Sequence, residues 1–121
     1  MKNLTVKTTD WTMTDEIAKY LDEKLVAIDK LLSDQDADTV RCDVELGKSR
    51  DQHAETWRAE MNLFVGGSMY RAEAHGETLQ AALDQVKDEM AQQLRKSKQK
   101  HASMLRKGGA AVKDWLRFGR N

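Results

Sequence analysis

The chain has 121 residues, of which 40% are hydrophobic and 33% charged, and this apolar content suits one domain with one core. No apolar run approaches the roughly 20 residues that a membrane span needs, and the first ten residues lack a signal-peptide pattern. A lone cysteine excludes an internal disulfide framework. We therefore expect a cytoplasmic protein. The formal net charge is zero because an acidic excess over residues 1–91 offsets a basic excess over residues 92–121.

The first part of the chain predicts a strand followed by a helix. Residues 3–8 alternate polar and apolar side chains and place Leu4 and Val6 on one face, which predicts a half-buried strand. Thr14 is the expected N-cap of the helix, with acidic residues in its first turn. Apolar residues at three-four spacing between Ile17 and Leu32 give this helix one core-facing stripe. The polar residues 33–38 predict a loop.

Three further strands follow. Residues 40–46, 55–65 and 69–75 each alternate between an apolar and a polar face, and Gly66-Gly67-Ser68 indicates a turn between the last two. Their short connections favour an antiparallel meander.

The last predicted helix starts after Gly76-Glu77-Thr78, and its helical pattern runs to about residue 107. It would have roughly 28 residues and a length of about 42 Å. Its apolar stripe fades after Leu94, so the basic half should project beyond the domain. Gly108-Gly109 should end the helix.

The predicted order is therefore β-α-β-β-β-α, an α+β fold in which two helices pack on one face of a four-stranded sheet, similar to double-stranded-RNA-binding domains. Residues 1–107 form the expected domain, and residues 108–121 form a basic and aromatic tail.

No catalytic or metal-binding pattern is present. The histidines His53, His75 and His101 are scattered and none stands at metal-ligand spacing. Cys42 falls on the apolar face of a strand, which favours a packed thiol over a nucleophile. We expect no enzyme activity, no cofactor and no small-molecule substrate.

The basic end of the chain carries the strongest functional signal. Residues 92–121 hold nine lysines and arginines against Asp114 alone. A helix dipole favours cations at its C-terminus and would explain two or three of them, but not nine. Such a field suits a polyanion such as nucleic acid. The candidate phosphate contacts within the predicted helix are Arg95, Lys96, Lys98 and Lys100.

Other residues could extend this footprint. Lys24 on the first helix and Arg71 and His75 on the open sheet face are candidates, although ordinary surface charge explains all three equally well. In the tail, Trp115, Arg117 and Phe118 are possible contacts. The tail aromatics could fold back on the domain, dock a protein partner or stack on bases.

Several local patterns, taken in order, resemble the ribosome hibernation factors, which include the short-form hibernation promoting factor and protein Y. These patterns are Thr14-Asp15, Lys24-Leu25, Leu79-Gln80-Ala81-Ala82-Leu83-Asp84, and Gln93-Leu94-Arg95-Lys96 with Lys98 and Lys100. The resemblance covers roughly residues 1–101. Thr78 and Gln80 depart from the acidic and aromatic residues that the family has near the Ala-Ala step.

The resemblance implies a protein that binds the small ribosomal subunit and the intact ribosome through 16S-type rRNA. It would occupy the channel of mRNA and tRNA and inhibit translation under stress or in stationary phase. Lys24, Arg71, Arg95, Lys96, Lys98 and Lys100 would then contact rRNA. Two alternatives remain, namely a general module for structured RNA and a protein-interaction module that acts through the tail.

Overall fold

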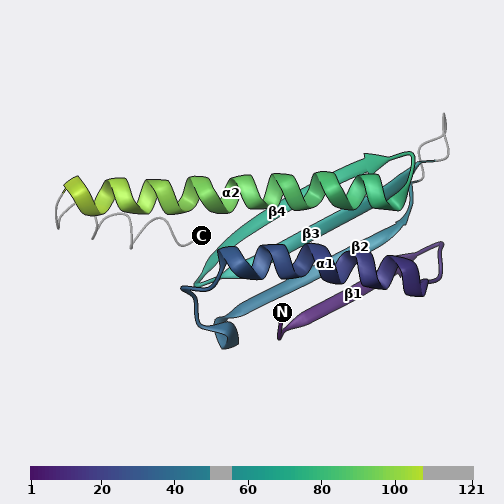
Figure 1. The fold of residues 1–121 in the computed structure, drawn as a ribbon, viewed down its shortest axis with the longest axis horizontal. Helices are drawn as coiled ribbons and strands as arrows, with labels where there is room; N and C mark the ends of the chain where they lie inside the picture. Colours follow the sequence, from purple (N-terminus) through teal and green to yellow (C-terminus); the bar gives the residue numbers. More distant parts are fainter. Residues whose placement is uncertain (50–55, 108–121) are drawn as a thin grey trace.

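Two helices cover one face of a four-stranded sheet in the computed structural model, which describes residues 1–49 and 56–107 (Figure 1). The elements, in order, are β1 (Leu4–Thr9), α1 (Asp15–Leu31), the short 3-10 helix η1 (Ala37–Thr39), β2 (Val40–Lys48), β3 (Trp57–Val65), β4 (Ser68–Gly76) and α2 (Leu79–Lys107). The predicted element order and the α+β class are confirmed.

The sheet is mixed, with its strands in the order β1-β2-β3-β4. β2, β3 and β4 form the predicted antiparallel meander, whereas β1 pairs parallel to β2. The parallel pair follows from the connection, because α1 carries the chain back along the sheet before β2 begins (Figure 1). β1 is an edge strand, and Leu4 and Val6 remain 37% exposed although their alternation predicts a half-buried strand.

Alternation along the strands separates a helix-facing side from an open face. Cys42 and Met61 point toward the helices and are fully buried. Their neighbours Arg41, Glu45 and Glu60 lie on the opposite side, which no helix covers (Figure 1). We call this side the open face.

α1 begins where the sequence predicts. The Thr14 hydroxyl oxygen accepts a hydrogen bond of 3.2 Å from the Ile17 amide, and Asp15 and Glu16 occupy the first turn. The apolar stripe of the helix packs against the sheet through Ile17, Leu21, Leu25 and Ile28, which are all buried.

α2 packs on β3 and β4 with its first half. Among the α2 side chains that the structure describes, up to Ser103, the buried ones end at Leu94, as the sequence predicts. At 1.5 Å per residue its 29 residues span about 43 Å. In Figure 1 the second half extends past the end of the sheet. None of the helices in the described part of the chain is long and apolar enough to cross a membrane.

Two tight places require glycine. A Cβ atom at Gly47 would lie 2.2 Å from the backbone oxygen of Thr9, because the end of β1 crosses close to β2 there. Gly66 and Gly67 adopt φ values of 54° and 86° in the turn between β3 and β4, a region that L side chains rarely adopt.

Candidate nucleic-acid interface

The projecting half of α2 presents four exposed cations with no acidic residue among them. Arg95, Lys96, Lys98 and Lys100 follow Leu94, which is the last buried residue among the side chains described up to Ser103. The stretch from Ala91 to Lys107 contains no aspartate or glutamate. The structure therefore brings together four of the six predicted RNA contacts.

Two hydrogen bonds fix α2 at the point where it leaves the sheet. The Gln93 side-chain amide donates to the backbone oxygen of Arg71 at 2.7 Å. The hydroxyls of Tyr70 and Ser97 lie 2.8 Å apart and share a hydrogen bond. Because both contacts reach β4, they fix the direction in which the basic half projects.

Helical spacing then assigns the cations to different flanks. Lys96 and Lys100 follow Gln93 by three and seven positions, so they share the flank that rests on the β4 edge. Lys98 lies on the other flank, where its ammonium is 3.5 Å from a carboxylate oxygen of Asp34 in the segment after α1. Arg95 points between these flanks, away from the sheet.

Lys24 is held by acidic and aromatic neighbours. Its Nζ atom lies 2.8 Å from Oδ1 of Asp84 on α2 and 4.6 Å from the centre of the Tyr20 ring. The Tyr20 hydroxyl donates to the same carboxylate at 2.6 Å. The hydrogen bond to Asp84 raises the pKa of Lys24, and the hydrogen bonds from Lys24 and Tyr20 lower the pKa of Asp84. The structure thus places Lys24 in a contact between the helices, apart from the projecting cations.

Arg71 belongs to a charge network on the open face. One glutamate from each of β2, β3 and β4, namely Glu45, Glu60 and Glu73, forms a row of register partners across the sheet. Such a row of like charges is destabilising unless it is neutralised. Arg71 contacts Glu73 at 3.0 Å and Glu60 at 3.6 Å.

Arg58 lies at the centre of this network. It forms ion pairs with Glu73 at 3.3 Å, with Glu45 at 3.8 Å and with Glu60. Hydrogen bonding from Arg58, with further help from His75 and Arg71, lowers the pKa of Glu73 to about 2. The three carboxylates outnumber the two guanidinium groups of Arg58 and Arg71, so Arg71 contributes less free positive charge than the sequence suggests.

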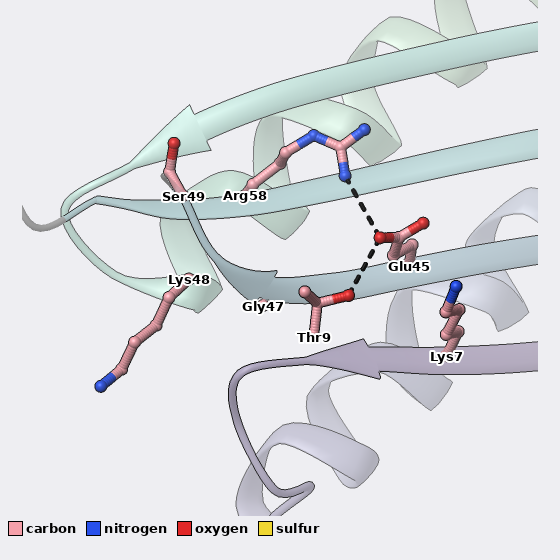
Figure 2. A pocket seen from close by; sticks show the side chains of 7 residues that line it. All are labelled: Lys7, Thr9, Glu45, Gly47, Lys48, Ser49 and Arg58. Carbon is pink, nitrogen blue, oxygen red and sulfur yellow. Dashed lines mark hydrogen bonds and ion pairs between the residues drawn. The ribbon is translucent and has the colours of Figure 1, made fainter. Parts of the chain in front are cut away.

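A shallow hollow of about 420 Å³ lies at one end of the network (Figure 2). Glu45 accepts a hydrogen bond of 3.0 Å from the Thr9 hydroxyl and faces Arg58, as the dashed lines in Figure 2 show. Lys7 points toward the same carboxylate (Figure 2). This hollow lies at the end of the sheet where β1 and β2 end and β3 begins, which is the opposite end of the domain from the projecting cations.

The other residues considered in the sequence are either buried or outside the described part of the chain. Cys42 is a packed core thiol, as predicted, and burial raises its pKa to about 12. Over residues 1–49 and 56–107, no group of three histidine, cysteine or acidic side chains could hold a metal ion. The predicted tail contacts Trp115, Arg117 and Phe118 lie outside the described residues.

Sequence reasoning missed one group on the open face. Phe64 occupies a position where the alternation of β3 calls for a polar residue, and this break in the pattern was the available signal. The Arg41 guanidinium carbon lies 4.1 Å from the centre of the Phe64 ring. Met69, the register partner of Phe64 on β4, is 49% exposed.

Comparisons with known proteins point to one family. The profile of the Sigma 54 modulation protein / S30EA ribosomal protein family matches residues 4–102. The chain is 34% identical over 101 residues to a ribosome hibernation promotion factor of Deinococcus radiodurans, with 79% of this chain and 49% of the relative covered. A ribosome hibernation promotion factor of a Picosynechococcus species is 30% identical over 90 residues, with coverages of 74% and 45%. The chain therefore spans about half the length of the curated relatives it matches.

Solved structures agree on the fold. The N-terminal domain of Protein Y from Thermus thermophilus superposes with a TM-score of 0.64 at 25% identity, over 78% of this chain and 97% of that domain. A ribosomal subunit interface protein from Coxiella burnetii superposes with a TM-score of 0.63 over 79% and 97% of the two chains. Its identity of 15% supports similarity of the fold alone.

Proposed function

Since the chain belongs to the Sigma 54 modulation protein / S30EA ribosomal protein family, we propose that it is a cytoplasmic ribosome hibernation factor that binds the small ribosomal subunit. The names of the two curated relatives support hibernation, and the name of the Coxiella protein is consistent with a site at the subunit interface. The observation in this chain that carries the proposal is the projecting half of α2.

The shape and charge of that helix suit a groove between phosphate backbones. An α-helix with its side chains is about 10–12 Å wide, and it reaches into spaces that the two-layer domain cannot enter. Arg95, Lys96 and Lys100 leave it at different angles, so they can contact phosphates on more than one wall. Each phosphate that is neutralised releases counterions, which favours binding at low salt.

The proposed mechanism is occupancy rather than catalysis. The helix would lie in the channel between the head and the body of the small subunit, where mRNA and tRNA anticodon stems otherwise bind. A protein held there by rRNA phosphates blocks initiation for as long as it stays bound. Such a block suits starvation or stationary phase, when idle ribosomes must be preserved.

Cosedimentation of the protein with purified small subunits tests this proposal. The informative variant reverses three cations of α2 that show no ion pair with the described acidic side chains, and the matched control reverses three exposed lysines elsewhere. The variant is R95E/K96E/K100E, and the control is K7E/K19E/K30E. At about 150 mM salt we expect the variant to lose binding and to stop inhibiting translation in a purified system, while the control retains both.

The two triple variants carry the same change in net charge, so a difference between them reports the position of the charge. Equal loss in both would contradict a specific role for α2 and favour nonspecific attraction. Retention of binding by R95E/K96E/K100E would overturn the proposal. A sucrose gradient of intact ribosomes would also report whether a dimer peak appears or single ribosomes stay idle.

A further inference from the structure

Phe64 is an aromatic residue on a face of the sheet that is otherwise polar. The other open-face positions of β2 and β3 hold charged or polar side chains or glycine. The core does not need the ring there, because the helices cover the opposite face (Figure 1). Core packing therefore does not explain the aromatic ring of Phe64 on this face.

Its two neighbours in the sheet complete a small patch. Arg41 and Met69 are the register partners of Phe64 on β2 and β4. The Arg41 guanidinium covers one face of the ring at 4.1 Å and lies 3.7 Å from a carboxylate oxygen of Asp43, and the Arg41 side chain is 58% exposed. The patch thus presents a planar cation backed by an aromatic ring, with the thioether of Met69 beside it.

The patch lies at the end of the domain where α2 projects. β3 ends and β4 begins beside Phe64 and Met69, and α2 runs antiparallel to β4 toward that same end (Figure 1). Arg71 and Met69 are alternate residues on the open face of β4. The hydrogen bond from Gln93 to the Arg71 backbone oxygen places the flank of Lys96 and Lys100 along this strand edge. A strand of RNA held by that flank could turn around the edge of β4 and reach the patch.

We propose that Arg41, Phe64 and Met69 form a stacking site for an unpaired base of bound RNA, with the base on the outer surface of the Arg41 guanidinium. Unpaired bases stack on aromatic rings and on guanidinium planes, and a guanidinium that already rests on a ring is oriented for that contact. The site takes single-stranded RNA because a base within a duplex keeps its faces covered by its neighbours. This inference rests on the proposed function, since the cations of α2 would supply the phosphate contacts.

The test compares a single-stranded RNA of about 12 nucleotides with a blunt RNA duplex of the same length by fluorescence anisotropy. Arg41→Lys keeps the charge and removes the plane, and Phe64→Leu keeps apolar volume and removes the ring. The matched control is Val26→Ala, which trims an apolar side chain on α1 with 47% exposure, close to that of Met69. We expect both patch variants to lose at least about fivefold in affinity for the single strand, with duplex affinity and the salt slope unchanged.

A second readout separates stacking from a general structural effect. An oligonucleotide that carries 2-aminopurine should lose fluorescence on binding to the wild-type protein and to the control, and less so on binding to Arg41→Lys. Equal loss of affinity for single strand and duplex, or single-strand affinity within twofold of wild type in both patch variants, would overturn the stacking site alone. If the wild-type protein binds neither RNA nor small subunits, both proposals fail.

Discussion

Lys24 of α1 and Asp84 of α2 form an ion pair of 2.8 Å that joins the two helices above the sheet. Tyr20 supports the pair twice, because its ring lies under the ammonium and its hydroxyl donates to the carboxylate. A lysine that the sequence offers as an RNA contact is therefore already used within the fold.

Replacing Asp84 by asparagine should destabilise the domain by about 1 kcal/mol, a modest value because the carboxylate is 48% exposed and water screens the pair. The pKa of Asp84 is lowered in the folded state, so its contribution is complete above its ordinary pKa near 3.8 and is lost as pH falls further. Urea unfolding of wild type and Asp84→Asn should show a stability difference at about pH 7 that narrows as pH falls below the ordinary pKa of 3.8. A gap that persists at the acid end would contradict this linkage.

The salt dependence of RNA binding should separate the cations by their partners. Lys96→Gln with Lys100→Gln removes two charges with no acidic neighbour in the described part of the chain, and we expect the slope of log K against log salt to fall by about 1.4 to 1.8. Lys98→Gln removes one charge and should lower the slope by less than half of that amount, because Asp34 already compensates this ammonium at 3.5 Å. Lys24→Gln should leave it nearly unchanged. An equal change in slope per charge removed at all four positions would show that the ion pairs do not persist in the complex.

Gly47 is a position where a methyl group should be costly. In Gly47→Ala the new Cβ would meet the Thr9 backbone oxygen at 2.2 Å, so β1 must shift away from β2. We expect the free energy of unfolding to fall by roughly 2–4 kcal/mol, which is typical of overpacking against the backbone. Thermal unfolding measures it, and Gly66→Ala serves as the control. A Cβ atom at Gly66 would make only an ordinary van der Waals contact of 3.9 Å with the Gln35 side chain, so at a φ of 54° that change should cost only about 1 kcal/mol of backbone strain.

Glu73 should make the stability of the open face depend on acid pH. Its pKa is about 2 in the folded protein, well below the usual 4.5, chiefly because Arg58 donates to it. A depressed pKa means that its stabilisation is full above pH 4.5 and is lost as pH falls toward 2. Glu73→Gln should therefore be less stable than wild type near neutral pH and nearly equal to it at about pH 2. Chemical unfolding at both pH values measures this, and Glu77→Gln, on the exposed segment before α2, should show no such convergence.

Local patterns in the chain specify which elements form and which of their faces are apolar. Three such patterns are the alternation from Val40 to Leu46, the three-four spacing after Thr14 and the end of the apolar stripe at Leu94. The strands and helices that form agree with them. The concentration of positive charge after Leu94 could also be read directly, because it depends only on composition along one helix.

Which of those charges remain available depends on how the elements pack. Tyr20 and Asp84 are separated by 64 positions along the chain. The spacing of residues in the sequence does not predict that α1 and α2 bring them together with Lys24. The same holds for Lys98 beside Asp34 and for Arg71 within the glutamate row. Coulombic attraction acts over a few ångströms, so the value of a charge depends on neighbours that the fold, and not the local sequence, supplies. The sequence thus predicts a basic helix, and the packing of the elements determines which of its cations have acidic neighbours and which remain available to a polyanion.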